Sequence, residues 1–413
     1  MITRRSALLG SALGAGSLIA ARAQAQHRPV QHGHPPGPNA GKEESGQPPP
    51  SPADTPLGPV DTKAKWAFIQ DFNTRAELLN KNADEQMPPS SMTKLMTIYI
   101  VYQRLKDGRL KLNDMLPVSE KAWRMGGSKM FVQLGSSVSV EDLIQGVVVQ
   151  SGNDACIVLA EAIAGSEQQF VEMMNAMAKK LGLTHTHYAN CTGWPDPDNY
   201  MSVRDIATLA ADLIRTFPQY YHFDSEKSFK YNNIEQYNRN PMVQRGTADG
   251  LKTGHTDAGG YGLVASTLRD GRRVVLVLNG METMRERAEE SERLMDWAFM
   301  NFDDVTLFSS GDPVEQAPVW LGVTRTVPLV GAHGVVVTLP RNWRQTAKID
   351  VSYNTPVRAP VALGTRLGKL TVSGQGVPQQ MEVPLVAGAD VPKLGWPGRA
   401  VAVLEHYVGV GGS

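Results

Sequence analysis

The sequence predicts an α+β protein with two domains, a larger one of helices and strands and a smaller all-β one. A length of 413 residues exceeds that of an ordinary single domain. Helical patterns of apolar residues, broken by strands and one tight hairpin, extend over about residues 61–302. From residue 303 to 403 the pattern changes to short alternating runs separated by Gly and Pro, which is typical of a small sandwich-like β domain.

Each part of the larger domain has a local signal. Residues 65–72 read as a buried strand, and a helix is expected to begin at Ser91 and to end at Gly108. Two strands, 261–268 and 273–279, flank the turn residues Asp270-Gly271, which predicts a hairpin. Further helices are predicted over residues 139–150, 154–164, 202–216 and 287–302.

The smaller domain and the end of the chain carry weaker signals. Strands are expected at residues 334–339, 348–353, 369–372 and 380–386. Residues 404–413 are short, Gly-rich and without basic side chains, so we expect a flexible tail. Such a tail is a poor anchor, and any membrane association should be weak.

The composition is that of a globular protein with a large core, since 41% of the residues are hydrophobic and 20% charged. Equal numbers of basic and acidic side chains, 41 of each, argue against a nucleic-acid partner. Two cysteines cannot form a disulfide framework. Cys156 lies in an apolar run and is expected to be buried, but a bridge to Cys191 in an oxidising compartment stays open.

The N-terminal residues predict export. Arg4 and Arg5 precede a mildly apolar run over residues 7–20, and small residues suited to cleavage follow it, so residues 1–25 read as a signal peptide. The paired arginines favour the twin-arginine route and therefore a bacterial periplasmic location. Residues 26–60 contain ten of the 27 prolines, which predicts a disordered linker.

Three short motifs occur in order within the larger domain: Ser91-Met92-Thr93-Lys94, Ser151-Gly152-Asn153 and Lys252-Thr253-Gly254. Each alone is common in proteins of this length. Together they supply a nucleophile, its bases and an anion-binding strand, which is a specific combination.

The first motif can form an activated serine. A serine hydroxyl needs a base to remove its proton, and Ser91 and Lys94 are neighbours on one helical face. An ammonium cannot accept a proton, so Lys94 must be desolvated or placed beside another cation, for which Lys252 is a candidate. The alternative is a surface helix with an exposed serine and lysine.

The other two motifs offer groups for binding and proton transfer. Ser151 could relay a proton to a leaving amine and Asn153 could hold a substrate carbonyl, although either residue could also be a helix cap. The third motif precedes the hairpin and should form an edge strand, where Gly254 leaves room for a ligand backbone. Lys252 and Thr253 could bind a carboxylate there, and the alternative is an ordinary exposed strand.

No metal or cofactor site is predicted. His185 and His187 have no third ligand at a suitable spacing, and no zinc-protease motif or phosphate loop is present in the sequence. We therefore expect both histidines to be structural.

The three motifs with their flanking residues closely resemble those of low-molecular-mass penicillin-binding proteins, the serine D-alanyl-D-alanine carboxypeptidases. The resemblance covers about residues 65–302 and continues faintly over the β domain. It implies the fold shared with β-lactamases, in which helices flank an antiparallel sheet and the site lies at their junction. The Lys-Thr-Gly-His form of the third motif points to the carboxypeptidase branch.

The resemblance also implies residue roles. Ser91 would be the acylated nucleophile, Lys94 its base and Ser151 a proton relay. Asn153 would bind the substrate amide, and Lys252, Thr253 and Arg287 would bind its carboxylate. Gly254 would lie in the substrate-binding strand. The backbone N–H groups of Ser91 and His255 would hold the oxyanion.

The implied substrates are peptidoglycan stem peptides ending in D-Ala-D-Ala, with β-lactams as covalent inhibitors. Three alternatives stay open: an endopeptidase that cuts D-Ala–diaminopimelate cross-links, a β-lactamase, and a non-catalytic muropeptide-binding scaffold. Fast deacylation in class A β-lactamases uses a glutamate, and the corresponding loop, residues 190–200, contains none. It offers only Asp196 and Asp198, next to prolines that favour a turn.

Overall fold

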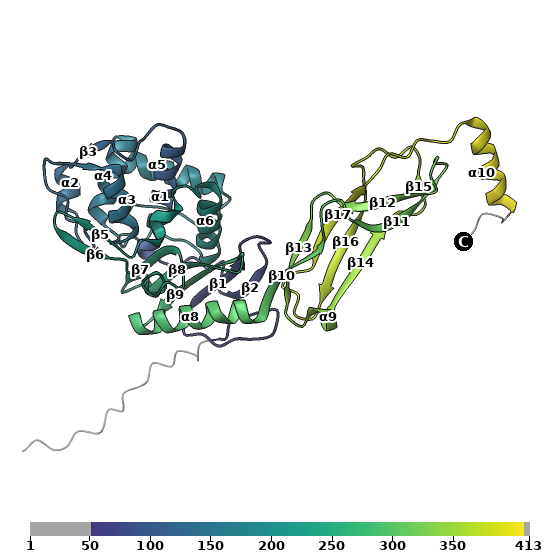
Figure 1. Ribbon diagram of the computed structural model, residues 1–413. Coiled ribbons are helices and arrows are strands. Elements are labelled where there is room, and N and C mark those ends of the chain that lie inside the picture. The colour runs from purple at the N-terminus through teal and green to yellow at the C-terminus, as the bar shows by residue number, and fades with distance from the viewer. Residues whose placement is uncertain (1–50, 409–413) are drawn as a thin grey trace, which may run out of the picture. The chain divides into compact units, whose positions relative to one another are not determined.

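The computed structural model describes residues 51–408, so the predicted signal peptide and residues 26–50 of the predicted linker lie outside the described residues (Figure 1). The prediction of disorder is wrong for the rest of that linker, because Ala53 is buried and its backbone pairs with that of Val60. The larger domain is built on one antiparallel sheet in the order β2-β1-β9-β8-β7. Its strands are β1 (Trp66–Asp71), β2 (Glu77–Lys81), β7 (Gly250–Thr256), β8 (Gly260–Arg269) and β9 (Arg272–Met281). This sheet confirms the predicted strand and hairpin.

Helices cover both faces of this sheet, as Figure 1 shows. Along β9, Val275 and Val277 join the core under one group of helices, whereas Leu276 and Leu278 join a second core that contains helix α8. The alternation follows from the two-residue period of a strand and explains why residues 274–278 of β9 are all apolar. The helices are α1 (Lys94–Lys106), α3 (Val140–Val148), α4 (Asn153–Ala164), α5 (Glu167–Lys180), α6 (Val203–Thr216) and α8 (Met284–Asn301).

Local signals set most helix ends. Ser139 and Ser202 accept hydrogen bonds from the backbone N–H groups of Asp142 and Asp205, which confirms both predicted caps. Helix α8 begins earlier than predicted because Thr283 caps it. The expected helix start at Ser91 is wrong by one turn, since a 3₁₀ turn, η1 (Ser90–Thr93), precedes α1.

Short elements complete the larger domain and border its central helices. They form two small two-stranded sheets and three short helical turns. Their bounds are β3 (Met115–Pro117), β4 (Ser137–Ser139), β5 (Ser228–Tyr231), β6 (Ile234–Tyr237), α2 (Glu120–Arg124), η2 (Tyr221–Ser225) and α7 (Pro241–Arg245).

The smaller domain is rich in β-structure, as predicted, and has its own apolar core. Strand β10 (Phe302–Phe308) pairs with β13 (Val335–Pro340), and a second sheet runs β14-β16-β17-β12-β11-β15. The bounds in that sheet are β11 (Pro313–Trp320), β12 (Thr326–Gly331), β14 (Ala347–Tyr353), β15 (Val357–Arg358), β16 (Arg366–Gly374) and β17 (Met381–Ala387), and α9 (Trp343–Thr346) precedes β14.

The end of the described chain differs from the prediction of a flexible tail. Helix α10 spans Trp396–Val408 and so includes residues 404–408. Pro397 lies in its first turn, where a missing N–H costs nothing, and the residues that follow can continue a helix. No helix between residues 51 and 408 is both long and apolar enough to cross a membrane.

Candidate active site

The first motif folds into a turn that brings its serine and lysine together. Lys94 Nζ donates a hydrogen bond to Ser91 Oγ at 2.8 Å. The Lys94 side chain is fully buried among apolar residues of the core, and this burial lowers its pKa to about 8. At neutral pH about a tenth of the lysine is therefore neutral and able to accept a proton.

The loop of residues 190–194, which is distant in sequence, contacts Lys94. Lys94 Nζ also donates to the carbonyl oxygen of Thr192, and the Asn190 side chain accepts the backbone N–H groups of residues 192–194. Gly193 has a φ of +77°, and a Cβ there would lie 1.8 Å from the carbonyl oxygen of Ser90. Only glycine therefore fits at this point of contact between the loop and the turn of the first motif, residues 90–93.

Ser151 occupies the turn between α3 and α4. Its φ is +66°, a left-handed conformation that is unfavourable for a serine, and its side chain is buried. Among the described residues, its Oγ has no hydrogen-bond partner. A strained residue with an unpartnered buried hydroxyl is the kind of feature that gathers at functional sites.

Asn153 begins helix α4 and faces a loop of residues 126–132. Its Nδ2 donates to the carbonyl oxygen of Gly126 at 2.8 Å, which uses one of the two amide hydrogens. The next residue, Asp154, is buried and accepts the backbone N–H groups of Met130, Phe131 and Val132. Asp154 thus holds the loop against Asn153, a role that sequence reasoning missed.

The third motif lies on β7, which is an edge strand of the sheet, as predicted. Lys252 and Thr253 are buried, and Lys252 Nζ donates to the Thr253 carbonyl oxygen at 3.2 Å. Burial, followed by the charges of Lys94 and Arg239, holds the pKa of Lys252 well below its usual value. A Cβ on Gly254 would lie 3.1 Å from the Pro89 carbonyl oxygen, so β7 packs directly against the turn of the first motif.

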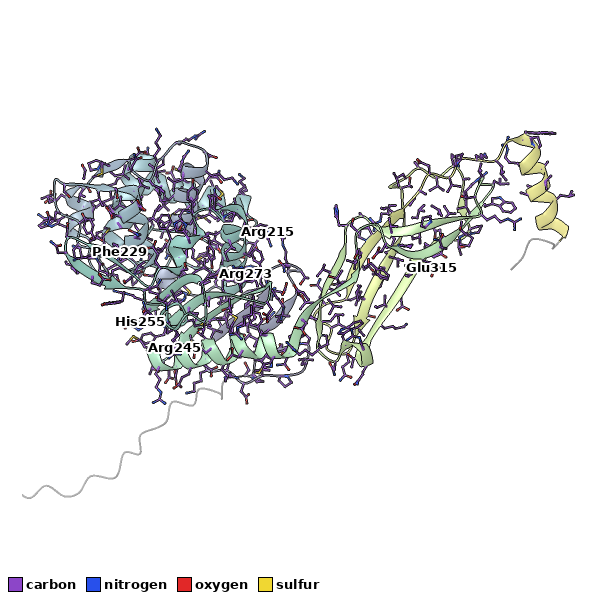
Figure 2. The ribbon with its side chains drawn as sticks, in the orientation of Figure 1. Arg215, Phe229, Arg245, His255, Arg273 and Glu315 are labelled. Atoms are coloured by element: carbon purple, nitrogen blue, oxygen red, sulfur yellow. The ribbon has the colours of Figure 1, made fainter. Side chains whose placement is uncertain are left out.

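His255 and Arg287 lie beside the end of β7. The exposed His255 ring stacks on Tyr261 with a centroid distance of 3.9 Å, and Figure 2 labels this histidine. The Arg287 guanidinium lies over the Tyr261 ring, 5.7 Å from its centroid. Burial lowers the pKa of Arg287 to about 10, and its Nε has no hydrogen-bond partner within residues 51–408. The structure thus brings the loosely predicted Arg287 to the same region as the motifs.

Sequence reasoning also missed Arg239. Its Nη1 donates to Ser128 Oγ at 2.7 Å, in the loop that Asn153 contacts, and its backbone carbonyl accepts from Arg287 at 3.5 Å. Its charge is among the causes that lower the pKa values of both Lys94 and Lys252. The cationic side chains of Lys94, Lys252, Arg239 and Arg287 therefore lie close together. The positive electrostatic potential that they create favours a bound anion. No short-range pattern around residue 239 marks this role.

The remaining candidates are two cysteines and two histidines. Cys156 and Cys191 are both buried free thiols, so the bridge that was left open is not formed. The backbone N–H of His185 binds the Asp205 carboxylate, and His187 Nδ1 lies 2.6 Å from the Asp198 carbonyl oxygen. In the described part of the chain, no three His, Cys, Asp or Glu side chains are grouped so as to hold a metal ion.

Comparison with known proteins assigns this site to a family. A family profile described as "D-alanyl-D-alanine carboxypeptidase" matches residues 52–283, more than half of the chain. The chain belongs to this carboxypeptidase family. A second profile, "Penicillin-binding protein 5, C-terminal domain", matches residues 302–393, which contain the strands of the β domain.

Members of the carboxypeptidase family resemble this chain over most of its length. The D-alanyl-D-alanine carboxypeptidase DacC of Escherichia coli is 38% identical over 351 residues, covering 82% of this chain and 86% of that protein. The crystal structure of penicillin-binding protein 5 from Haemophilus influenzae matches with a TM-score of 0.74 at 35% identity, over 82% of this chain and all of that one. A D-alanyl-D-alanine endopeptidase of Pseudomonas aeruginosa is 30% identical over only 56% of this chain.

Proposed function

We propose that this protein removes the terminal D-alanine from peptidoglycan stem pentapeptides through an acyl-enzyme on Ser91. The observation that carries the proposal is the 2.8 Å hydrogen bond between Lys94 Nζ and Ser91 Oγ, with the lysine pKa lowered to about 8. It supplies a base beside a hydroxyl that is otherwise a poor nucleophile.

In the acylation step, neutral Lys94 takes the proton of Ser91 as the serine Oγ bonds to the carbonyl carbon of the penultimate D-alanine. The backbone N–H groups of Ser91 and His255 would hold the oxyanion. Ser151 would pass a proton to the amine as the C–N bond breaks and D-alanine leaves. Its buried Oγ has no hydrogen-bond partner in the described part of the chain, which supports this role.

Binding would use the groups around this centre. Asn153 has a second amide hydrogen for the peptide carbonyl of the substrate. The terminal carboxylate would bind Lys252, Thr253 and Arg287, together with Arg239. An incoming carboxylate would raise the depressed pKa of Lys252 and so favour the charged lysine that binds it. The edge of β7 that does not pair with β8 could pair with an extended peptide.

Digestion of defined muropeptides tests the activity. We expect pentapeptides to lose one D-alanine, identified by mass, while cross-linked dimers are cut much more slowly. Preferential release of monomers from dimers would instead support the endopeptidase alternative.

Mixing with penicillin separates the proposal from a β-lactamase. In the 190–200 loop, the Asp196 side chain accepts the backbone N–H of Asp198, which is turn geometry rather than that of a water-positioning base. We expect a penicilloyl adduct on Ser91 that persists over many minutes in intact-mass spectra. Rapid return to the unmodified mass, with excess penicillin destroyed, would favour a β-lactamase.

The location follows from the sequence and not from the described residues. A signal peptide over residues 1–25 with Arg4-Arg5 would deliver the folded protein to the periplasm, where its substrate lies. Trp396, Val401 and Leu404 are exposed on α10 and could add a weak attachment to a membrane surface. Fractionation of cells carrying the wild type and an Arg4→Lys, Arg5→Lys variant would test the route, since the variant should stay in the cytoplasm.

A further inference from the structure

Trp194 is an exposed aromatic residue whose backbone is held by hydrogen bonds. The residue is 46% exposed. Asn190 Oδ1 accepts the Trp194 N–H at 3.0 Å, and Asn190 Nδ2 donates to the Trp194 carbonyl oxygen at 3.0 Å. The ring is thus presented to solvent from a loop that also supplies the Thr192 carbonyl to Lys94.

The indole lies beside the asparagine that is proposed to hold the substrate amide. A Cβ added to Gly127 would lie 2.9 Å from Trp194 Cζ3 and 2.8 Å from Asn153 Nδ2, so the two side chains meet at this glycine. At Gly126, whose carbonyl accepts from Asn153, an added Cβ would lie 3.3 Å from the indole Cη2. The ring therefore packs on the Gly126–Gly127 backbone and borders Asn153.

Covalent geometry places one part of the substrate here. The amide that Asn153 would bind joins the third residue of the stem peptide to the penultimate D-alanine, and its carbonyl oxygen belongs to the third residue. The side chain of that residue is attached only one carbon from the carbonyl carbon. A substrate held by Asn153 therefore carries its third side chain close to Trp194.

We infer that Trp194 forms the wall of a subsite for the third residue of the stem peptide and selects a linear aliphatic side chain, such as that of a diamino acid. A flat indole offers a large apolar contact to a chain of methylene groups at a small cost in conformational entropy. A glycine at the third position would leave this wall uncovered. The inference rests on the proposed carboxypeptidase function.

The test uses N-acetylated tripeptides X-D-Ala-D-Ala in which X is glycine, norvaline, norleucine or Nε-acetyl-lysine, with D-alanine release as the readout. For the wild type we expect kcat/KM to rise with side-chain length, by about tenfold from glycine to norleucine. In Trp194→Ala this ratio should fall to about one or two, whereas Trp194→Phe should keep most of it. Trp396→Ala, which removes an exposed tryptophan of α10, serves as the matched control and should keep the wild-type ratio.

The outcomes separate the two proposals. A flat series in the wild type, or an unchanged norleucine-to-glycine ratio in Trp194→Ala, would overturn the subsite while leaving the carboxypeptidase intact. An equal loss on every peptide also leaves that ratio unchanged, and would mean that Trp194 only positions Asn153. Failure of the wild type to release D-alanine from any peptide would refute the proposed function, and the subsite with it.

Discussion

The interiors of the two domains differ in what they bury. The larger domain holds Lys94, Lys252, Asp154 and Arg287 with less than a tenth of each side chain exposed. In the β domain, the described residues include a single buried polar side chain, Thr338, and its core consists of Val, Leu and Ala. Burying a charged group costs several kcal/mol unless the group is paired, so the larger domain gives up stability at its site.

The difference indicates where selection for activity acted. An apolar core such as that of the β domain stabilises a fold without the free-energy cost of burying charged groups. Two desolvated lysines with lowered pKa values have no such structural purpose, but they are what an acylating serine and a carboxylate site require. The predictions below therefore contrast changes at the site with changes in an apolar core.

The largest effect is expected from Ser91→Ala. We expect D-alanine release and covalent labelling by a fluorescent penicillin to fall by roughly 10³-fold or more, because no acyl-enzyme can form. Thermal unfolding should barely change. The neighbouring Ser90→Ala, which removes only a hydrogen bond to Thr256, is the matched control and should still be labelled. Labelling of the Ser91→Ala protein would contradict the assignment.

The pH dependence tests the base. Lys94 accepts a proton only when neutral, so kcat/KM should rise with pH, about tenfold per unit, and level off above the lysine pKa of about 8. A pH profile of the wild type measures this rise in kcat/KM. The Lys94→Ala variant should lose most activity, by roughly 10³-fold. A rise of kcat/KM centred at pH 4–5 instead would indicate a carboxylate base and exclude Lys94.

An intermediate effect is expected at Gly193. A Cβ there would meet the Ser90 carbonyl oxygen, so Gly193→Ala must shift the turn of residues 90–93. We expect kcat/KM to fall about 10–100-fold and the free energy of unfolding to fall by about 1–3 kcal/mol. Gly182→Ala is the control, because Gly182 has a φ of +73° but no atom near an added Cβ. Equal kinetics in both variants would show that the close approach is unimportant.

The smallest effect on activity is expected from a cavity in the β domain. Leu370 is fully buried in that core, so Leu370→Ala should lower the free energy of unfolding by about 2–5 kcal/mol. Because the β domain contributes none of the motif residues, kcat/KM should stay within about twofold. Denaturant unfolding and peptide assays on one preparation measure both quantities. A large loss of activity in the folded variant would mean that the β domain supports the site.

Much of the fold could be read from local patterns. The hairpin turn at Asp270-Gly271 and the caps at Ser139 and Ser202 depend on residues within a few positions of one another. Such signals need no knowledge of distant partners. The helix start near Ser91 was misplaced because packing against β7, and not a local cap, sets the geometry of that turn.

The sequence by itself determined the chemistry: a serine and a lysine one turn apart, a second serine with an asparagine, and a lysine-containing strand at the sheet edge. Only the tertiary structure decided the surroundings of those groups. Lys94 meets the Thr192 carbonyl across 98 residues, and Arg239 meets Ser128 across 111. The lowered pKa of Lys94 follows from burial, which is a property of the packed core. Contacts between such distant segments leave no periodic signal in the chain, so one sequence cannot reveal them.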